Sequence, residues 1–548
     1  MTSSVEPAFE PATWSELDFT QRLRVSTRDY ILRGCAIPLS AYLFHAVKLA
    51  LFVAGWFVVC WLTPGLGGVG QLGEWVYRPI AFQKAVLWAG LWEVLGLASM
   101  SGPLGLRVWP PFTAFLQFAR VGTTKLAPFP GAPLVGGFTR TRFDVLCYVG
   151  YVAAVVYALV QPELQPLDFL PLVILLPLCA LGDRVVPLAA RWEHHFAMCV
   201  CFLLAGDWIA ACKWVQLSIW FWAGVSKLTV AFPYVVAIMA ANNPSMRSHA
   251  LRRGLFRAAP DDLAPSAVPK LMAVAGTLLE FGTPLVFLFV THAGPLQWLG
   301  VALMLALHGF ILSNMPIAAV FEWNVFSVFA GLFLFVGHPE VSLFDVGSLP
   351  LVLYLVVALL VLPVLGNFFP AKVSFLISMR YYAGNWAWAA YLFRGRSFEK
   401  LGQVKRVGPT LLEQLERFFA PARAVQIHES FNAFRSMHLQ GRVLGLLLPR
   451  VLQGRASQEY TWVDGELVAA SVLGWNFGEG HLYDERFLAA IQSQCHFEPG
   501  ELRAVCVEAQ PLFGSALHWR IVDASEGTLA EGYAELSDLA GRAPWDCG

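Results

Sequence analysis

The chain has 548 residues, of which 57% are hydrophobic and only 14% are charged. A typical soluble domain carries about 25% charged residues, so this composition excludes an ordinary soluble enzyme and a disordered chain. Lys and Arg number 38 together, as do Asp and Glu, so the chain has no basic surplus of the kind that marks a nucleic-acid-binding protein. The apolar runs are as long as membrane-spanning helices, which predicts an all-α polytopic membrane protein.

About ten apolar segments are long enough to cross the hydrocarbon core of a bilayer, which takes roughly 20 helical residues. They lie near residues 43–63, 84–104, 144–161, 168–183, 192–207, 214–240, 269–291, 296–313, 317–337 and 349–369. The segment 214–240 is longer than one span requires and has room for a break near Pro233. We therefore expect an N-terminal arm of residues 1–40 followed by a transmembrane helical domain of residues 41–370.

Basic residues are concentrated in every second loop. The N-terminal arm and the loops around 107–142 and 247–257 contain clusters of Arg and Lys, whereas the loops around 163–168, 291–295 and 340–345 are poor in them. Because loops rich in Lys and Arg stay in the cytoplasm, this alternation predicts a multi-pass protein of the plasma (bacterial inner) membrane. It also predicts that both termini are cytoplasmic.

The composition changes twice after residue 370. Residues 371–450 contain 12 Lys and Arg but 4 Asp and Glu, a net charge of +8. This segment fits either amphipathic helices lying on an anionic membrane surface or a basic juxtamembrane linker. Residues 451–548 contain 5 Arg and 15 acidic residues, a net charge of −10, and their pattern shifts towards strands. The sequence therefore predicts a small C-terminal α+β domain over residues 451–548.

Individual elements of this part of the chain can also be predicted. Residues 459–470 indicate a hairpin about an Asp464-Gly465 turn, and residues 515–523 and 528–536 indicate a second hairpin. A strand is expected at 502–507, and helices are expected at 411–419 and 486–494. The domain has neither a glycine-rich phosphate loop nor a nucleophile elbow, so we expect it to support the membrane part or to contact a protein partner.

Ionisable residues inside membrane segments are costly and are therefore candidates for function. Lys227 is the most informative, because apolar turns flank it on both sides. In one interpretation burial leaves its amine neutral and able to act as a base. In the other, Lys227 pairs with an acidic residue such as Glu280 and holds two helices together. Glu93 lies in the middle of another predicted span, so a proton-coupled transporter that uses Glu93 and Glu280 is a further alternative.

Three of the histidines in or beside apolar segments are further candidates. His194 and His195 begin one such segment, and neighbouring helical residues point about 100° apart, so we expect only one to face a given site. That one is a candidate proton donor or hydrogen-bond partner, and the alternative is an interfacial cap. His308 lies deep in a predicted span with Asn314 further along it. Both fit either a polar cavity or hydrogen bonds between helices.

Residues 190–340 resemble the membrane part of vitamin K-dependent γ-glutamyl carboxylases and the wider horizontally transferred transmembrane family. The stretch Phe221-Trp-Ala-Gly-Val-Ser226-Lys227-Leu is similar to the end of the helix that holds their active-site lysine, with Ser226 in place of the first of their two lysines. Three further blocks follow the same order, at His195, at Leu278–Phe289 and at His308 to Phe329. The region containing Pro79–Lys84 and Leu91–Gly96 also resembles an uncharacterised bacterial membrane family, which supplies no activity.

The carboxylase resemblance implies an enzyme that oxidises a reduced quinone of the vitamin K type with O₂. Lys227 would start proton abstraction, His194 or His195 would orient a reacting group, and His308 would contact the quinone. The remaining candidates for substrate binding are Trp220, Phe221, Trp222, Asn314, Glu280 and Glu93.

No metal, haem or flavin motif is visible in the sequence, so any redox chemistry would belong to the substrate. Membrane lipids are the expected partners, together with a protein partner at the C-terminal domain, and no nucleic acid is expected. Besides the enzyme and the transporter, a non-catalytic protein that binds lipid or assembles with partners stays open.

Overall fold

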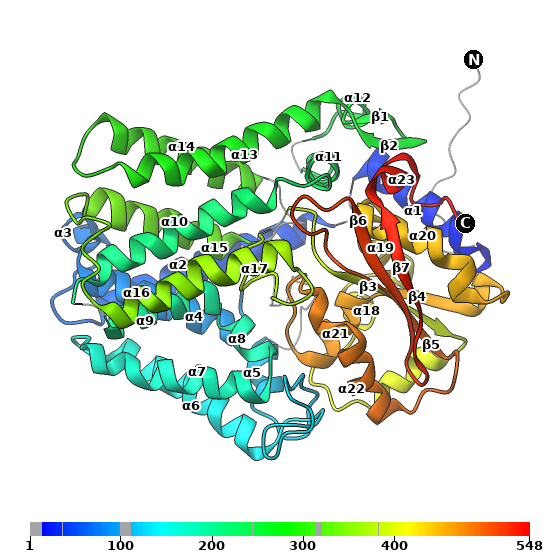
Figure 1. Cartoon of the computed structure of the whole chain (residues 1–548), viewed down its shortest axis with the longest axis horizontal. Coiled ribbons are helices and arrows are strands. Elements are labelled where there is room, and N and C mark those ends of the chain that lie inside the picture. The colour runs from blue at the N-terminus through cyan, green and yellow to red at the C-terminus, as the bar shows by residue number, and fades with distance from the viewer. Residues whose placement is uncertain are drawn as a thin grey trace.

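The structure is a computed structural model of the chain that describes residues 14–34, 37–98, 111–204, 206–243, 246–313, 320–381 and 383–547. Long helices run side by side along the molecule, and a five-stranded sheet with its own helices lies at one end of them (Figure 1). The predicted combination of a helical membrane part with a small C-terminal α+β part is therefore present.

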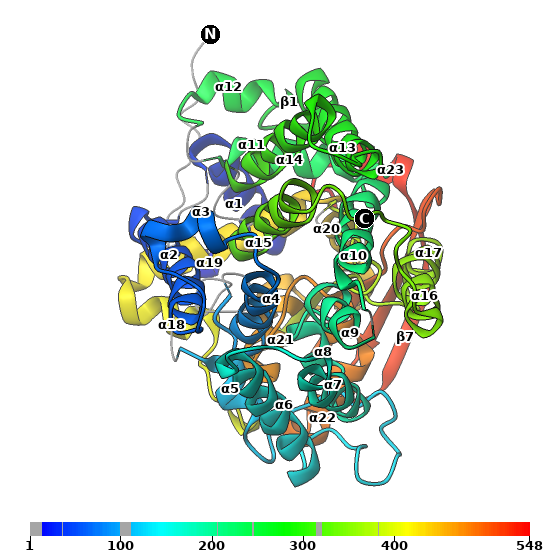
Figure 2. The ribbon, with the colours of Figure 1, turned by 90° about the vertical axis from the view of Figure 1, so that its left-hand side faces the viewer.

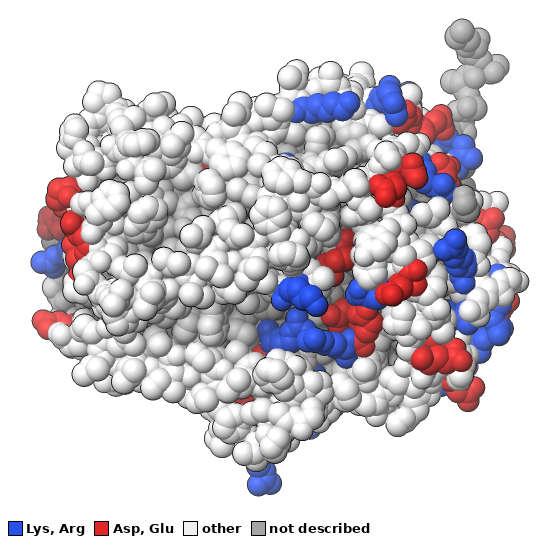
Figure 3. Space-filling view, viewed as in Figure 1, with Lys and Arg blue, Asp and Glu red and all other residues white. Residues whose placement is uncertain are grey.

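Five helices of the described residues are long and apolar enough to cross a membrane. They are α2 (Leu39–Trp61), α6 (Arg142–Val160), α13 (Ala267–Leu288), α14 (Pro295–Ser313) and the continuous helix Leu349–Phe368, which contains α16 (Leu349–Val356) and α17 (Leu362–Phe368). Large apolar side chains on their outer faces are exposed, among them Leu43, Leu146 and Leu271. In Figure 3 the surface over these helices forms an almost uncharged band, with charged side chains at its two ends. Such a band is what a lipid-facing surface requires.

The prediction of about ten spans is not confirmed. Other apolar segments form shorter helices, namely Pro166–Gly182, Phe232–Ala241 and Phe321–Gly337. Phe232–Ala241 is only about 15 Å long and the other two are about 25 Å long, whereas the hydrocarbon core is about 30 Å thick. Still others, such as α4 (Pro79–Val94) and α10 (Trp208–Ser226), bury most of their residues against neighbouring helices (Figure 2). Hydropathy along the chain does not distinguish a helix buried in protein from one that faces lipid.

The segment 214–240 is broken, as the sequence suggested. α10 ends at Ser226 and α11 (Phe232–Ala241) starts after a five-residue turn. Pro233 occupies the first turn of α11, where its missing N–H costs no hydrogen bond. Lys227 is consequently the C-cap residue of α10, and its backbone N–H bonds to the carbonyl of Gly224.

The first described helix and the last described residues lie at the same end of the helices (Figure 1). There α1 (Phe19–Arg33) packs on α19 (Pro421–Met437) of the C-terminal part, and Arg28 of α1 pairs with Asp261 of a basic loop. The Lys405 ammonium donates to the carbonyl of Val121, which belongs to another basic loop. The loops that the charge pattern assigned to one side of the membrane are therefore gathered around the C-terminal domain.

The sheet is antiparallel throughout, with the order β4-β3-β5-β6-β7. Its strands are β3 (Trp388–Arg394), β4 (Tyr460–Asp464), β5 (Leu502–Val507), β6 (Ala516–Asp523) and β7 (Gly527–Glu535). The predicted strand at 502–507, the hairpin at 515–536 and the helix at 486–494 are confirmed, the last as α22 (Glu485–Cys495). A separate two-stranded ribbon, β1 (Phe256–Ala258) and β2 (Asp262–Pro265), precedes α13.

The predicted hairpin at Asp464-Gly465 is wrong. Asp464 ends β4 and its side chain caps the helix α21 (Gly465–Leu473), accepting a hydrogen bond from the N–H of Glu466 at 2.7 Å. A Cβ at position 465 would lie 2.9 Å from the carbonyl oxygen of Ala389. Gly465 is therefore needed for the close approach of β3 and not for a turn, because an Asp-Gly pair serves a helix start as well as a hairpin.

Residues 371–450 contribute to the same sheet as the acidic part. β3 lies between β4 and β5, and the predicted helix at 411–419 is α18 (Leu411–Phe418). α20 (Leu439–Leu452) buries most of its residues and packs on β5, while α19 packs on α1 and α18.

Candidate functional site

A buried ion pair joins two central helices at the position the sequence singled out. The Nζ atom of Lys227 lies 2.7 Å from Oε2 of Glu280 on α13, and the side chains are 10% and 4% exposed. The same ammonium also donates to the carbonyl of Ala223 at 3.2 Å. Bringing two charges out of water is costly, and the pair repays that cost only while both partners are present. The pairing with Glu280, which the sequence allows as the alternative to a catalytic role, is therefore present. What this pair can do chemically depends on the groups around it.

A second polar group faces the same space. The indole N–H of Trp220 donates to Nε2 of His308 at 3.0 Å, and Nδ1 of His308 lies 2.7 Å from Oδ1 of Asn324 on α15 (Phe321–Gly331). Since Nε2 accepts, the proton of a neutral imidazole belongs on Nδ1, where it donates to the amide oxygen. Both nitrogens of His308 are engaged, so this ring is fixed in orientation.

These groups line one cavity of about 160 Å³. Lys227, Glu280, His308, Asn324 and His194 supply its polar wall. The rest of the wall is largely apolar and comes from α10, α11, α13, α14 and α15, including Trp220, Phe232, Val236, Leu307, Ile311 and Trp323. Small-molecule sites commonly combine an apolar wall with a few convergent polar groups, and here the polar groups come from helices far apart in the sequence.

The rings of the two adjacent histidines stack on each other in an irregular helical turn. Residues Trp192–Phe196 form a π-helical turn, and the rings of His194 and His195 stack with centroids 4.9 Å apart. His194 lines the cavity and its Nε2 lies 3.2 Å from Oε1 of Gln216. His195 is buried behind it, and neither of its ring nitrogens has a hydrogen-bond partner among the described residues. Isolated π-helical turns are frequent at functional sites.

Sequence reasoning missed a second charged group at the cavity. Arg191 has a left-handed backbone conformation and lies over the ring of Trp323, with its Cζ 3.3 Å from the ring centroid. It donates to Glu193 at 2.6 Å and to the hydroxyl of Tyr381 at 3.2 Å, and that hydroxyl donates to Glu193 at 2.9 Å. The short spacing of Arg191 and Glu193 before the two histidines was a usable signal. Tyr381 gave none, because it follows the last predicted span.

The other predicted residues that the structure describes lie outside this cavity. Glu93 accepts a hydrogen bond from the indole N–H of Trp323 and so lies behind one wall. Phe221 and Trp222 line a different, apolar cavity of about 710 Å³ between α10, α13 and α16. Asn314 falls outside the described residues. Among the residues that are described, no group of three or more His, Cys, Asp or Glu side chains is placed to hold a metal ion.

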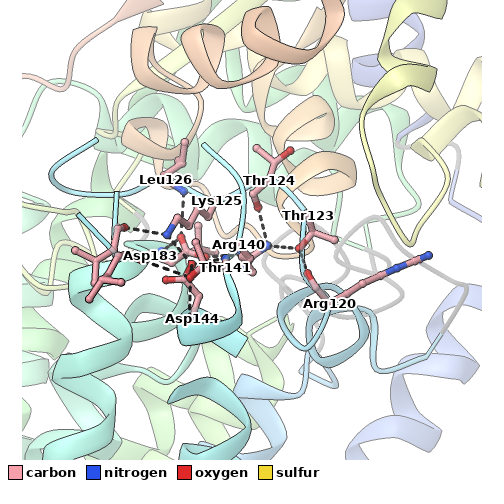
Figure 4. A network of polar contacts seen from close by, with 12 residues as sticks. Arg120, Thr123, Thr124, Lys125, Leu126, Arg140, Thr141, Asp144 and Asp183 are labelled. Carbon is pink, nitrogen blue, oxygen red and sulfur yellow. Dashed lines mark hydrogen bonds and ion pairs between the residues drawn. The ribbon is translucent and has the colours of Figure 1, made fainter. Parts of the chain in front are cut away.

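A separate network of buried charges lies in the loop before α6 (Figure 4). Lys125 donates to Asp144 at 2.6 Å and to the carbonyl of Val135 at 2.9 Å. Arg140 pairs with Asp183 and donates to the carbonyl of Thr124 at 2.6 Å. The four charged side chains are at most 4% exposed.

This network also supports the C-terminal domain. The side-chain amide of Gln494 on α22 donates to the hydroxyl of Thr124 at 3.1 Å. On α5 (Thr113–Phe118), the amide of Gln117 donates to the carbonyl of Val472 at 2.8 Å. Lys125 and Arg140 belong to a loop whose positive charge was expected to lie at the membrane surface. Both side chains are instead buried in ion pairs that stabilise the fold.

A protein-family model matches residues 2–548 of the chain. No curated protein and no solved structure matches the chain. The match agrees with the resemblance to an uncharacterised membrane family and carries no link to the γ-glutamyl carboxylases. The chain belongs to the family of transmembrane proteins of unknown function DUF3556.

Proposed function

We propose that this integral membrane protein is an enzyme that oxidises a lipid-soluble hydroquinone in the cavity beside Lys227. One observation carries the proposal: the ion pair of Lys227 and Glu280, the fixed ring of His308 and the ring of His194 converge on a single cavity with largely apolar walls.

The size of the cavity favours a ring. An apolar cavity of about 150 Å³ in another protein binds benzene, so about 160 Å³ accommodates one six-membered ring. Its walls include the aromatic side chains of Trp220, Phe232 and Trp323. A phenolic ring satisfies both parts of the site, because its face packs on aromatic side chains and its hydroxyl needs a polar partner. A lipid-soluble compound also reaches such a cavity through the bilayer.

The ion pair supplies a base without leaving a lone charge in the membrane. When the proton of Lys227 moves to Glu280 over the 2.7 Å contact, both groups become neutral and the amine can accept a proton from the substrate hydroxyl. Glu280 thus stores one proton during the reaction. His308 and Arg191 act as positioning residues. Hydrogen bonds from Trp220 and to Asn324 fix the ring of His308. The guanidinium of Arg191 is held by Glu193, Tyr381 and Trp323.

The overall reaction that we propose consumes O₂. One hydroquinone and one O₂ give one quinone epoxide and one water, so one oxygen atom enters the ring and the other leaves with the two hydroxyl protons. The proposal stops before carboxylation of a second substrate. Ser226 stands where the carboxylases have a lysine, and its hydroxyl is occupied by the carbonyls of Ala223 and Tyr381.

We also propose that the protein lies in the plasma membrane with both termini in the cytoplasm. The N-terminal arm, the basic loops and the C-terminal domain are in contact with one another at one end of the helices. Loops rich in Lys and Arg favour the cytoplasmic side. A cysteine-accessibility assay on intact cells tests this orientation, with Cys547 as an exposed native thiol among the described residues.

The proposal is tested by incubating the purified protein with a reduced one-ring benzoquinone and O₂ and measuring the epoxide by mass spectrometry. We expect the wild type to form it, and we expect Lys227→Ala and Glu280→Gln to lower the rate by at least ~100-fold, the usual size of a lost general base.

Lys213→Met is the matched control. Lys213 lies on the same helix and is buried, but its ammonium binds the carbonyls of His338 and Val341 and does not line the cavity. Equal epoxide formation by the wild type and Lys227→Ala would exclude the assigned base. Quinone that binds tightly without turnover would point instead to a lipid-binding protein.

A further inference from the structure

A polar cavity of about 500 Å³ lies where the C-terminal domain meets the membrane helices, apart from the cavity beside Lys227. Three separate parts of the chain meet there. Arg184 follows α7 (Leu170–Gly182), Lys372 follows α17, and His481, Asp484, Glu485 and Arg486 lie at and before the start of α22. This convergence leaves no pattern in the sequence, because the three parts are far apart along the chain.

The cavity has a surplus of positive charge. Among the ion pairs of the described residues, none involves the side chain of Arg184, Lys372 or Arg486, although Arg184 interacts electrostatically with Asp484. The carboxylate of Glu485 is already paired with Arg520. Three cations therefore face one carboxylate, that of Asp484.

The fourth basic group does not change this balance. His481 is held between Glu479, 2.9 Å from its Nδ1, and Glu508, 3.1 Å from its Nε2. Its charge is therefore compensated inside the domain. The carboxylate of Asp484 is also occupied in part, because it accepts the backbone N–H of Arg486 at 2.9 Å. An anion entering the cavity would thus meet three cations that have no ion-pair partner within the described part of the chain.

The cavity lies just beyond the ends of two apolar helices, where a bilayer that covers these helices has its lipid headgroups. Lys372 is four residues beyond the end of the span Leu349–Phe368, and Arg184 is two residues beyond the apolar helix Pro166–Gly182. Phe369 is 59% exposed and Phe513 is 77% exposed, and Phe513 packs on Phe368 at the end of that span. In Figure 3, Lys and Arg side chains gather where the uncharged band meets the C-terminal domain.

We propose that this cavity binds the phosphate group of an anionic phospholipid. The guanidinium groups of Arg184 and Arg486 match the geometry of phosphate oxygens, and the ammonium of Lys372 adds a mobile point charge. Basic pockets at the ends of membrane helices recognise headgroups in this way. The site is independent of the proposed oxidation, because none of its residues lines the cavity beside Lys227.

The test uses the full-length protein in detergent and native mass spectrometry with short-chain phosphatidylglycerol and phosphatidylcholine. We expect saturable binding of phosphatidylglycerol, weakened at least about tenfold in Lys372→Ala/Arg486→Ala, and no preference for phosphatidylcholine. Lys372 and Arg486 are exposed, so the double variant should keep the wild-type unfolding temperature. Arg455→Ala removes an exposed cation elsewhere in the domain and should leave the affinity unchanged.

Competition distinguishes a lipid from a soluble phosphate. Displacement of the lipid by millimolar inorganic phosphate would identify a soluble phosphate compound as the ligand of the same site, whereas no displacement would identify the lipid. The proposal is overturned if the double variant binds phosphatidylglycerol as tightly as Arg455→Ala does, or if both lipids bind equally.

Discussion

Two groups of buried charges differ in what surrounds them. In the loop before α6, Lys125 and Arg140 each meet a carboxylate and backbone carbonyls, and the group joins the membrane helices to the C-terminal domain. In the centre of the helices, Lys227 and Glu280 also pair, but the pair borders a cavity that His308 and His194 share. Packed charges of the first kind brace a fold. Charges that line a cavity are placed to meet a ligand, so the two groups should respond differently to substitution.

The largest effect is expected in the loop network. Arg140→Met leaves Asp183 buried without its cation, and removing one partner of a buried pair typically costs about 3–5 kcal/mol. Denaturant unfolding in detergent should show this loss, and Arg140→Met/Asp183→Leu should recover part of it because no lone charge remains. If Arg140→Met is as stable as the wild type, the loop network does not stabilise the fold.

A third group of buried charges lies in the C-terminal domain, where His481 pairs with Glu479 and Glu508. Like the loop network, it should affect stability and not activity. Burial lowers the pKa of His481, but Glu508 and Glu479 outweigh it and raise the pKa to about 10. Burial raises the pKa of Glu479, yet His481, Ser374 and Arg380 lower it to about 2.

The direction of the pH dependence follows from these shifts. The histidine contribution to stability is complete below its unfolded pKa of 6.5 and is lost as pH rises towards about 10. The Glu479 contribution is complete above 4.5 and is lost as pH falls towards about 2. The unfolding temperature should therefore be highest between pH 4.5 and pH 6.5, the two unfolded pKa values. In His481→Gln the unfolding temperature should fall less as the pH rises above this range. An alkaline fall that His481→Gln leaves unchanged would contradict the assignment.

The cavity pair should respond in activity more than in stability. Lys227→Ala leaves Glu280 beside a cavity, where protonation removes its charge, so the unfolding temperature should fall less than in Arg140→Met. The rate of epoxide formation should fall at least ~100-fold. If Lys227→Ala unfolds as readily as Arg140→Met, the pair is a brace like the loop network.

The smallest effect is expected at Trp220. Trp220→Phe keeps an aromatic ring but leaves Nε2 of His308 without its donor, a loss of about 1–3 kcal/mol. Trp222→Phe is a matched control, since its indole N–H donates to the carbonyl of Leu359 at 2.7 Å and it lines the other cavity. Epoxide formation should fall only in Trp220→Phe, and equal losses in both variants would show that His308 has no positioning role.

Part of this arrangement could be predicted from sequence. A lysine inside an apolar run needs either a neutral state or a partner such as Glu280, and the second of these two interpretations names the pair that the structure contains. The break near Pro233 follows from the length of its segment. The number of spans could not be predicted from hydropathy, because α4 and α10 are apolar and yet buried by other helices.

The rest of the site depends on contacts between distant residues. Tyr381 reaches Glu193 across the cavity wall, and β3 enters the sheet between two strands that follow it in the chain. Neither contact leaves a periodic pattern in the sequence. The Asp464-Gly465 pair shows the opposite difficulty, since one local pattern is compatible with both a hairpin and a helix start.

The central claim is that the cavity beside Lys227 holds the ring of a lipid-soluble hydroquinone. The most direct measurement is photolabelling of the purified protein with an azide-bearing quinone, followed by peptide mapping. We predict labels on α10, α13 and α14 that an excess of unlabelled quinone removes, with the Trp222→Phe variant labelled like the wild type. Labels confined to the lipid-facing surface, unchanged by competitor, would contradict the account.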